Sequence, residues 1–339
     1  MSTLLLFKLP VILHETGLLL SGWIYLVASI SMFILYMVSG FRKNIPFSRL
    51  LLGAATCFIF FALGSRLPGI SCSEWNQCIH QGEWPHAENK TILGGLAGLL
   101  AAMGLLAAWS RNSLQACDQV AIALPVGMGI QRITCLLSGC CSGIPTHLPW
   151  AVRYDQHSDA WNSQLMSGRI TAAEQFSLPV HPTQIYDILA WIFIFFLVAG
   201  AVRFLHSPGN RLLLTLLLYG IFRFFLEFLR DPYYDVLRNS TGGIKNIQWI
   251  ILAALPLLAF IIITKEIRFR GASLPDETGD AALWKHLILT MIVATLFLIS
   301  YHALNLQEIL AMTLLLAALF VMSVIKIFRT MDIRTIIIR

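Results

Sequence analysis

Ionisable side chains inside apolar stretches are the residues of this sequence best placed to do chemistry. Arg223, Glu227 and Arg230 follow one another at spacings of four and three residues in a run that is otherwise apolar. On a helix these spacings put all three side chains on one face, where the carboxylate can pair with one guanidinium group or bridge both. The face would then keep one positive charge in excess.

Two more arginines stand in apolar runs: Arg66 at the end of the second run, and Arg132 in the fourth. An arginine near the middle of a bilayer costs about 2.5–3.5 kcal/mol, so such residues tend to face a cavity and a partner. Arg132 and the excess charge beside Glu227 predict a pocket with at least two unpaired guanidinium groups, suited to bidentate contact with a phosphate. A structural ion network that binds any lipid headgroup is the alternative, and the charges alone leave both open.

A second group of polar residues stands at the start of the fifth apolar run, in the order His181, Pro182, Gln184 and Tyr186. Proline fits the first turn of a helix, so a helix is expected to begin here. His181 and Gln184 would then share a face and present an imidazole and an amide at the membrane interface. Alternatively, His181 caps the helix while Gln184 and Tyr186 anchor it among the headgroups.

The cysteines suggest structural roles. Cys72 and Cys78 lie in a long loop that we assign to the outer side, where a loop-closing disulfide is plausible. Cys140 and Cys141 are adjacent and lack the two-residue spacer of common zinc sites, so we expect no metal, and no cofactor is indicated. We interpret Cys135, Cys140 and Cys141 as packing residues.

The composition is that of a membrane protein. Of the 339 residues, 57% are apolar and 12% are charged, against about a quarter charged in soluble proteins. Nine apolar runs are long enough to cross a bilayer about 30 Å thick, which predicts an all-α, polytopic helical bundle of about nine transmembrane helices with long outer loops. The runs begin near Leu18, Leu50, Leu93, Gln115, Thr183, Arg211, Ile247, Leu287 and Glu308.

The basic residues indicate topology and not nucleic-acid binding, although the formal net charge is +6. They are thinly spread beside the apolar runs, and more than half fall on the inner side if the N-terminus is outside. We therefore expect an outer N-terminus and a cytoplasmic C-terminus. Two long loops, 67–90 and 138–182, then face outward, and loops of this length are usually functional.

Several of these features, in order, resemble the prolipoprotein diacylglyceryl transferase family. The resemblance spans roughly residues 10–265. The segments that carry it are Gly64–Leu67, Gly94–Gly98, Arg132–Gly143, Pro149–Val152, His181–Asp187, Arg223–Arg230 and Gln248. Family members have seven spans, so we expect a transferase-like core over 1–270 and two additional helices with a basic tail over 271–339.

The resemblance is to a divergent member. Where the family has a histidine before the paired glycines this chain has Leu93, and where it has a tyrosine in the first span this chain has Ser21. The asparagines that follow the family's arginine are also replaced after Arg132. The arginines that could bind an anion are better kept than the groups that could act as acids or bases.

The resemblance implies transfer of the diacylglyceryl group of phosphatidylglycerol to the lipobox cysteine thiol of a prolipoprotein, with release of glycerol phosphate. The partners would be these substrates and membrane lipids, and the place the bacterial plasma (inner) membrane. The implied catalytic residues are His181, Arg132 and Arg223, and the implied substrate-binding residues are Arg66, Gly143, Gln184, Tyr186, Glu227 and Arg230. Two alternatives are a non-catalytic protein that binds phospholipid headgroups, and a transferase that uses the same lipid with a different acceptor.

Overall fold

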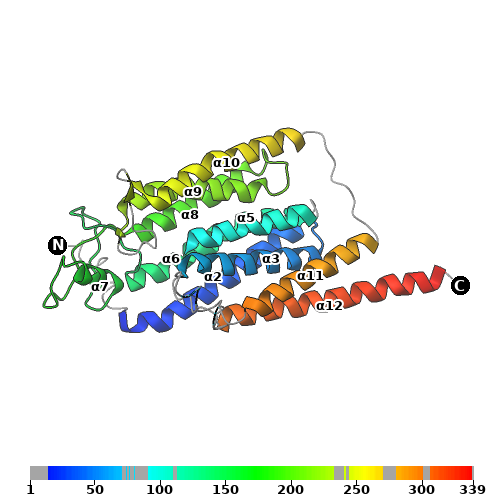
Figure 1. Ribbon diagram of the computed structural model, residues 1–339, viewed down its shortest axis with the longest axis horizontal. Helices are drawn as coiled ribbons and strands as arrows, with labels where there is room; N and C mark the ends of the chain where they lie inside the picture. Colours follow the sequence, from blue (N-terminus) through cyan, green and yellow to red (C-terminus); the bar gives the residue numbers. More distant parts are fainter. Residues whose placement is uncertain are drawn as a thin grey trace. The chain divides into compact units, whose positions relative to one another are not determined.

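The structure is a computed structural model that describes most of the chain. The described residues are 14–70, 74, 76, 80, 91–109, 113–232, 240–241, 244–269, 280–300 and 306–337. Helices account for nearly all of the regular structure in this part (Figure 1). The long helices are α2 (His14–Arg42), α3 (Phe47–Arg66), α5 (Ile92–Trp109), α6 (Leu114–Ser138), α8 (Thr183–Ala201), α9 (Asn210–Leu229), α10 (Asn246–Phe269), α11 (Asp280–Ser300) and α12 (Leu306–Ile337).

The shorter elements are the 3-10 turn η1 (Leu67–Gly69), helix α7 (Asp159–Met166), and strands β1 (Ser240–Thr241) and β2 (Ile244–Lys245). The two strands pair in antiparallel fashion and lead directly into α10. Each of the nine predicted apolar runs forms a helix, so the prediction of an all-α membrane bundle is confirmed.

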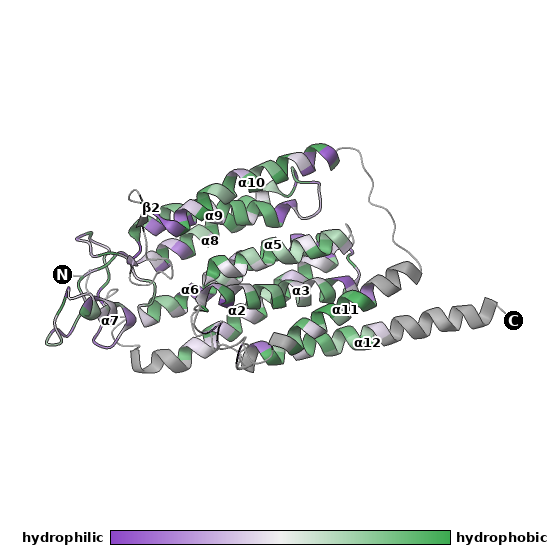
Figure 2. Cartoon of the chain, viewed as in Figure 1, coloured by the Kyte–Doolittle hydropathy of each residue, from purple (hydrophilic) through white to green (hydrophobic). Residues whose placement is uncertain are grey.

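In the described part of the chain, seven helices are long and apolar enough to cross a membrane. They are α2, α3, α5, α6, α8, α9 and α10. In the described parts of α11 and α12 the apolar stretches are shorter, His286–Leu298 and Glu308–Ser323, so a crossing by these two helices stays a prediction. In Figure 2 apolar residues run along the middle of α8, α9 and α10, and polar residues gather near β2 and in the loops around α7.

The chain folds as two compact units. The first consists of residues 1–36 and 120–270, and the second of residues 37–119 and 271–339.

In the first unit, α9 packs between α8 and α10 (Figure 1). Trp191 of α8 stacks on Tyr219 of α9 with ring centroids 4.2 Å apart, and both side chains are fully buried. The Thr215 hydroxyl of α9 donates to the Ala121 carbonyl of α6, 3.4 Å away. These contacts pack α6, α8 and α9 together, and the long loop 139–182 connects the last turn of α6 to the first turn of α8.

The loop 139–182 is ordered by its own small core. Val152, Tyr154, Ala160 and Val180 form a buried cluster, and backbone bridges join Val152 to Val180 and Asp155 to Phe176. Helix α7 begins within the loop, where the Ser158 hydroxyl accepts from the Trp161 amide as a helix N-cap. The loop is therefore a folded head on the helices of the first unit.

The second unit is organised around α3, which packs against α5, α11 and α12. The contact between α3 and α5 is made by backbone, because glycines stand at the crossing. A Cβ atom on Gly98 would meet the Phe60 carbonyl, and one on Gly64 would lie 3.0 Å from the Gly98 Cα. Small residues at such positions let membrane helices approach closely.

Candidate functional site

The charged face of α9 has the geometry that its spacing predicts. The Glu227 carboxylate is fully buried, and its Oε2 lies 2.7 Å from Arg223 Nη2 and 3.7 Å from Arg230 Nη1. A buried carboxylate needs such partners because leaving water costs several kcal/mol per ion. Glu227 therefore fixes both guanidinium groups on one side of α9.

A third cation reaches the same carboxylate from another element. Lys245, the last residue of β2, donates through Nζ to Glu227 Oε1 and to the Arg230 carbonyl, at 3.1 Å each. Gln248 holds this segment: its Oε1 accepts from the Lys245 amide at 2.9 Å, and its Nε2 donates to the Phe224 carbonyl at 3.0 Å. An amide side chain that accepts from the residue before the helix resembles half of a capping box, and here it also ties α10 to α9.

The first turns of α8 form the other side of the site, across from the charged face of α9. Thr183 Oγ1 donates to the Cys141 carbonyl at 2.6 Å, and Gln184 Nε2 donates to the Cys140 carbonyl at 2.7 Å. These bonds hold a turn in which Gly139 and Cys141 both have positive φ, 76° and 58°. Positive φ is uncommon for a residue other than glycine, so the turn depends on these side-chain contacts.

Asp187, one turn further along α8, pairs with Arg132. Asp187 Oδ2 lies 2.5 Å from Arg132 Nε, and both side chains are largely buried. The sequence interpretation of Arg132 as an unpaired guanidinium group was therefore wrong. Pairing is expected physically, because an uncompensated buried charge is costly.

Gly143 joins the two walls through backbone hydrogen bonds. Its amide donates to the His181 carbonyl at 3.0 Å, and the next amide, that of Ile144, donates to the Leu229 carbonyl at 2.9 Å. A Cβ atom on Gly143 would lie 2.6 Å from the Leu229 oxygen and 2.8 Å from the His181 oxygen. Only a glycine at this position fits between the backbone at His181 and the backbone at Leu229 without displacing either segment.

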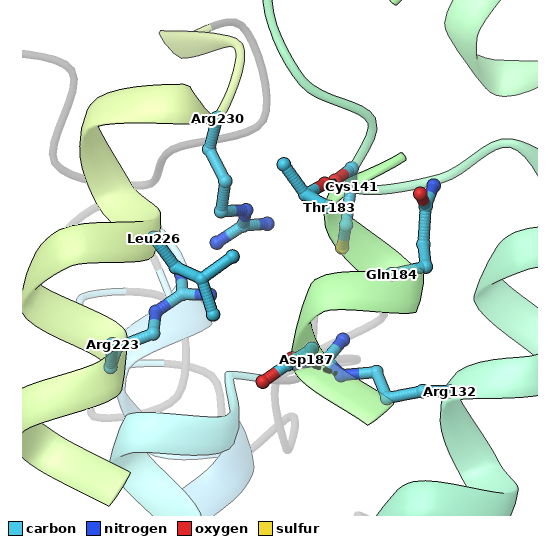
Figure 3. A pocket seen from close by; sticks show the side chains of 8 residues that line it. All are labelled: Arg132, Cys141, Thr183, Gln184, Asp187, Arg223, Leu226 and Arg230. Atoms are coloured by element: carbon cyan, nitrogen blue, oxygen red, sulfur yellow. Dashed lines mark hydrogen bonds and ion pairs between the residues drawn. The ribbon is translucent and has the colours of Figure 1, made fainter. Parts of the chain in front are cut away.

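A pocket opens between these walls (Figure 3). Its lining consists of Arg132, Cys141, Thr183, Gln184, Asp187, Arg223, Leu226 and Arg230. The cavity volume is about 10 Å³, which is room for about one water molecule, so the charged and polar ends of the lining side chains lie close together.

The pocket and its ion pairs have a positive excess. Within the described part of the chain, the ion pairs of the site join the four cations Arg132, Arg223, Arg230 and Lys245 to the two carboxylates of Asp187 and Glu227, which gives these six side chains a formal charge of +2. The Gln184 Oε1 atom is also buried and has no hydrogen-bond partner among the residues that the structure describes. Guanidinium groups with a net positive charge favour an anion that can accept several hydrogen bonds, such as a phosphate.

His181 and Tyr186 form a separate polar group beside the pocket. His181 Nδ1 lies 3.4 Å from the Tyr186 hydroxyl, which accepts from Trp150 Nε1 at 2.7 Å. Burial of the ring lowers the pKa of His181 below its usual 6.5, which favours the neutral imidazole. Neither side chain is among those that line the described pocket.

The remaining predicted site residues lie elsewhere. Arg66 belongs to the second unit, is almost fully buried and pairs with Glu308 of α12. Cys72 and Cys78 lie outside the described residues, so their disulfide stays a prediction. Among the described residues, Cys135, Cys140 and Cys141 are free thiols, and no group of three or more metal-binding side chains is present.

Sequence reasoning missed two charged residues of the site. Asp187 follows Gln184 by three residues on the same helix face, and this spacing was a usable signal for a counter-ion of Arg132. Lys245 gave no such signal, because a two-residue strand brings it to Glu227 from another part of the chain.

Comparison with known proteins agrees with the resemblance seen in the sequence. A model of the family described as prolipoprotein diacylglyceryl transferase matches residues 90–264. Three relatives carry the name phosphatidylglycerol–prolipoprotein diacylglyceryl transferase. The one from Mannheimia succiniciproducens is 33% identical over 169 residues, covering 48% of this chain and 56% of the relative. The one from Pasteurella multocida is 32% identical over 172 residues (49% and 57%), and the one from Nitrosospira multiformis is 28% identical over 193 residues (56% and 58%).

The chain thus spans somewhat more than half the length of these curated relatives. The family match covers just over half of this chain and includes every residue that lines the pocket. With seven helices among its described residues that are long and apolar enough to span a membrane, the chain is a polytopic membrane protein that belongs to the prolipoprotein diacylglyceryl transferase family.

Proposed function

We propose that this chain transfers the diacylglyceryl group of phosphatidylglycerol to the lipobox cysteine thiol of a prolipoprotein and releases glycerol phosphate. The observation that carries the proposal is the pocket in which the guanidinium groups of Arg132 and Arg223, from two different helices, face one space together with Arg230. Membership of the transferase family supports the choice of reaction.

The charge of the pocket matches the charge that the reaction develops. The acceptor sulfur attacks the glycerol carbon that carries the phosphodiester, a C–S bond forms, and the C–O bond to phosphate breaks. The phosphate changes from a diester with one negative charge to a monoester with about −1.5 to −2 at neutral pH. Fixed guanidinium groups in a site of low dielectric stabilise this added charge more than they stabilise the bound lipid, which is the requirement for catalysis.

We assign the phosphate to Arg132 and Arg223, with Arg230 as a third donor. Glu227 orients Arg223, and Asp187 holds Arg132 in the corresponding way on α8. Gln184 can present its amide to the glycerol hydroxyls, because its Oε1 is buried and without a partner. Gly143 lets the two walls approach each other.

The acceptor thiol must lose its proton to become a good nucleophile, because its ordinary pKa is near 8.5. We propose His181 as the group that receives this proton. Its lowered pKa keeps the imidazole neutral near pH 7, and the Tyr186 hydroxyl is placed to orient the ring. Leu93 stands where the family has its histidine, so no side chain at that position can take this role.

We propose that the protein lies in the bacterial plasma membrane with its N-terminus outside, which places the head and the pocket at the outer face. In this arrangement residues 1–270 carry the transferase core. Residues 271–339 add two helices, and the packing of α11 and α12 on α3 supports a stabilising role for them within the second unit.

The experiment is expression in bacteria depleted of their own transferase, together with assay of the purified protein for glycerol phosphate release from phosphatidylglycerol. The native chain should modify a reporter lipoprotein, and Arg223→Ala should lower turnover by about 10²–10³, the cost of losing one group that stabilises a developing charge. Arg203→Ala is the matched control, because Arg203 lies over the Phe204 ring just beyond α8, outside the pocket, and should keep full activity.

Three outcomes would contradict the proposal. Full turnover in Arg223→Ala would exclude the phosphate role. Binding of phosphatidylglycerol by the folded native chain without glycerol phosphate release would favour a headgroup-binding protein, whereas release without lipoprotein modification would favour another acceptor.

A further inference from the structure

Three free thiols meet at the wall of the pocket, and the reaction described above uses none of them. Cys135 lies in the last turn of α6. Cys140 and Cys141 follow in the turn whose carbonyl groups accept hydrogen bonds from Thr183 and Gln184 of α8. Their side chains lie within hydrogen-bonding reach of one another. Arg132 Nη1 also approaches the Cys135 sulfur, at 3.7 Å.

Cys141 occupies a special place in this group. It lines the pocket, and Figure 3 shows its sulfur turned into the space between Arg132 and Arg223. Its backbone has a φ of 58°, held by the Thr183 hydroxyl on its carbonyl. An uncommon conformation that the surroundings maintain at a site is a reason to look for a role of that residue.

The surroundings of Cys141 also favour its ionised form. Hydrogen bonds from the Cys135 and Cys140 thiols, together with the Arg132 and Arg223 guanidinium groups, hold the pKa of the Cys141 thiol below its usual range. Thiolates in positively charged, partly exposed sites are the cysteines that react with oxidants and electrophiles. Cys141 is half-buried and therefore open to a small reagent.

We propose that Cys141 is an oxidation site, which a hydroperoxide converts to a sulfenic acid and which Cys135 then resolves to a disulfide. The Cys141 sulfur attacks the outer oxygen of the peroxide, the O–O bond breaks, and an alcohol or water leaves as the peroxide is reduced. The Cys135 thiol then attacks the sulfenic sulfur, an S–S bond forms, and water leaves. Reduction by an added dithiol reverses the oxidation.

Geometry selects Cys135 over Cys140 as the resolving thiol. Adjacent residues have Cα atoms about 3.8 Å apart across a trans peptide, whereas disulfides join Cα atoms about 4.4–6.8 Å apart. A bridge between Cys140 and Cys141 would therefore be strained. Cys135 is separated from Cys141 by the turn at Gly139, so its Cα is free of this restriction.

The bridge would close the pocket to anions. It draws two sulfurs from hydrogen-bonding distance to about 2.05 Å, which pulls the turn carrying Cys141 toward α6. Cys135 also loses the thiol that Arg132 contacts. This consequence for substrate binding rests on the proposed function, whereas the reactivity of the thiols does not.

The first test maps the thiols in the full chain in phosphatidylcholine nanodiscs at pH 7. Hydrogen peroxide is added with dimedone, which traps sulfenic acids, and peptides are read by mass spectrometry. Cys141 should be trapped at least tenfold faster than Cys57 and Cys117, two buried cysteines in helices that serve as internal controls. Equal rates at all three cysteines would overturn the proposal.

Serine variants identify the resolving thiol. Without dimedone, the native chain and Cys140→Ser should form the disulfide between Cys135 and Cys141, whereas Cys135→Ser should retain the sulfenic acid. Cys135→Ala repeats the test if the serine variant does not fold. A bridge that persists in Cys135→Ser, or that is lost in Cys140→Ser alone, would assign the resolving role to Cys140 and contradict the proposal.

The second test measures binding of sn-glycerol 1-phosphate before and after oxidation, using calorimetry. Oxidation should weaken binding at least tenfold, dithiothreitol should restore it, and Cys141→Ser should keep its own untreated affinity after peroxide. Unchanged binding in the oxidised native chain would show that the bridge does not close the pocket. Absence of binding in the reduced native chain would instead count against the proposed function, while the thiol map would still decide the oxidation site.

Discussion

The arginines of the pocket illustrate how single side chains are held in place by their neighbours. Arg223 is fixed by Glu227 and Arg132 by Asp187, and these two pairs come from separate helices. The placement of Arg223, Glu227 and Arg230 on one face of α9 could be predicted from the sequence, because spacings of four and three residues put side chains on the same helix face. The pair of Arg132 with Asp187 joins α6 to α8, and the position of Asp187 on the same face as Gln184 was its one signal in the sequence.

At the residue scale, Gly143→Ala should open the pocket and destabilise the first unit. The new Cβ would meet two carbonyl oxygens within 2.8 Å, and forced overpacking typically costs about 1–3 kcal/mol. Thermal unfolding of the reconstituted protein measures this loss. Gly200→Ala is the control, because nothing lies within 4 Å of its added Cβ, and an equal loss in both variants would contradict the explanation.

The pH dependence of transfer should report on His181. Only the neutral ring accepts a proton, and burial places the folded pKa below 6.5. The rate should therefore rise with pH through that lower value and level off near neutrality. His181→Asn should remove this acidic limb and lower the rate by about 10²–10⁴, as expected for loss of a general base.

A matched substitution elsewhere in the head controls the pH experiment. His157 is exposed and has a φ of 72°, a conformation that asparagine tolerates well. His157→Asn should leave both the rate and the pH profile unchanged. An acidic limb that remains in His181→Asn would assign the titration to another group.

At the scale of elements, the helices were predictable and their crossings were not. Apolar runs such as 183–201 define a helix by length and composition alone, and α8 begins at Thr183 as predicted. The hairpin that brings Lys245 to Glu227 has strands of two residues each. Such short strands have no periodicity to detect, so the contact of Glu227 with Lys245 could be found only in three dimensions.

The crossing of α3 and α5 gives a test of helix packing. Gly98→Ala would bring a Cβ against the Phe60 carbonyl and within 3.3 Å of the Phe61 amide nitrogen, so we expect a loss of about 1–3 kcal/mol in unfolding free energy. Gly104→Ala in the same helix meets nothing within 4 Å. It should be neutral or stabilise by up to about 1 kcal/mol, because alanine favours helix over glycine.

Unfolding of both variants in the same detergent measures this difference. Equal stabilities for Gly98→Ala and Gly104→Ala would mean that α3 and α5 can move apart to accommodate the added Cβ without losing unfolding free energy. The glycine run would then have no packing role in the second unit.

At the scale of the whole molecule, an ion pair ties α12 to α3 within the second unit. Arg66 is almost fully buried at the end of α3, and the Glu308 carboxylate of α12 is its ion-pair partner. The family resemblance implied a substrate-binding role for Arg66, which stays a prediction, and the sequence around Arg66 gave no sign of this ion pair. The partner is 242 positions away, beyond any local pattern.

Glu308→Gln should therefore destabilise the second unit by about 1–3 kcal/mol, less than the roughly 3–5 kcal/mol for a fully buried pair, because Glu308 keeps 22% of its side chain exposed. Arg66→Met should also destabilise, whereas the double variant, with neither charge, should recover most of the loss. Unfolding of all four proteins gives the coupling energy between the two residues. Additive losses would exclude the ion pair as the tie, and retained phosphatidylglycerol affinity in the double variant would contradict substrate binding by Arg66.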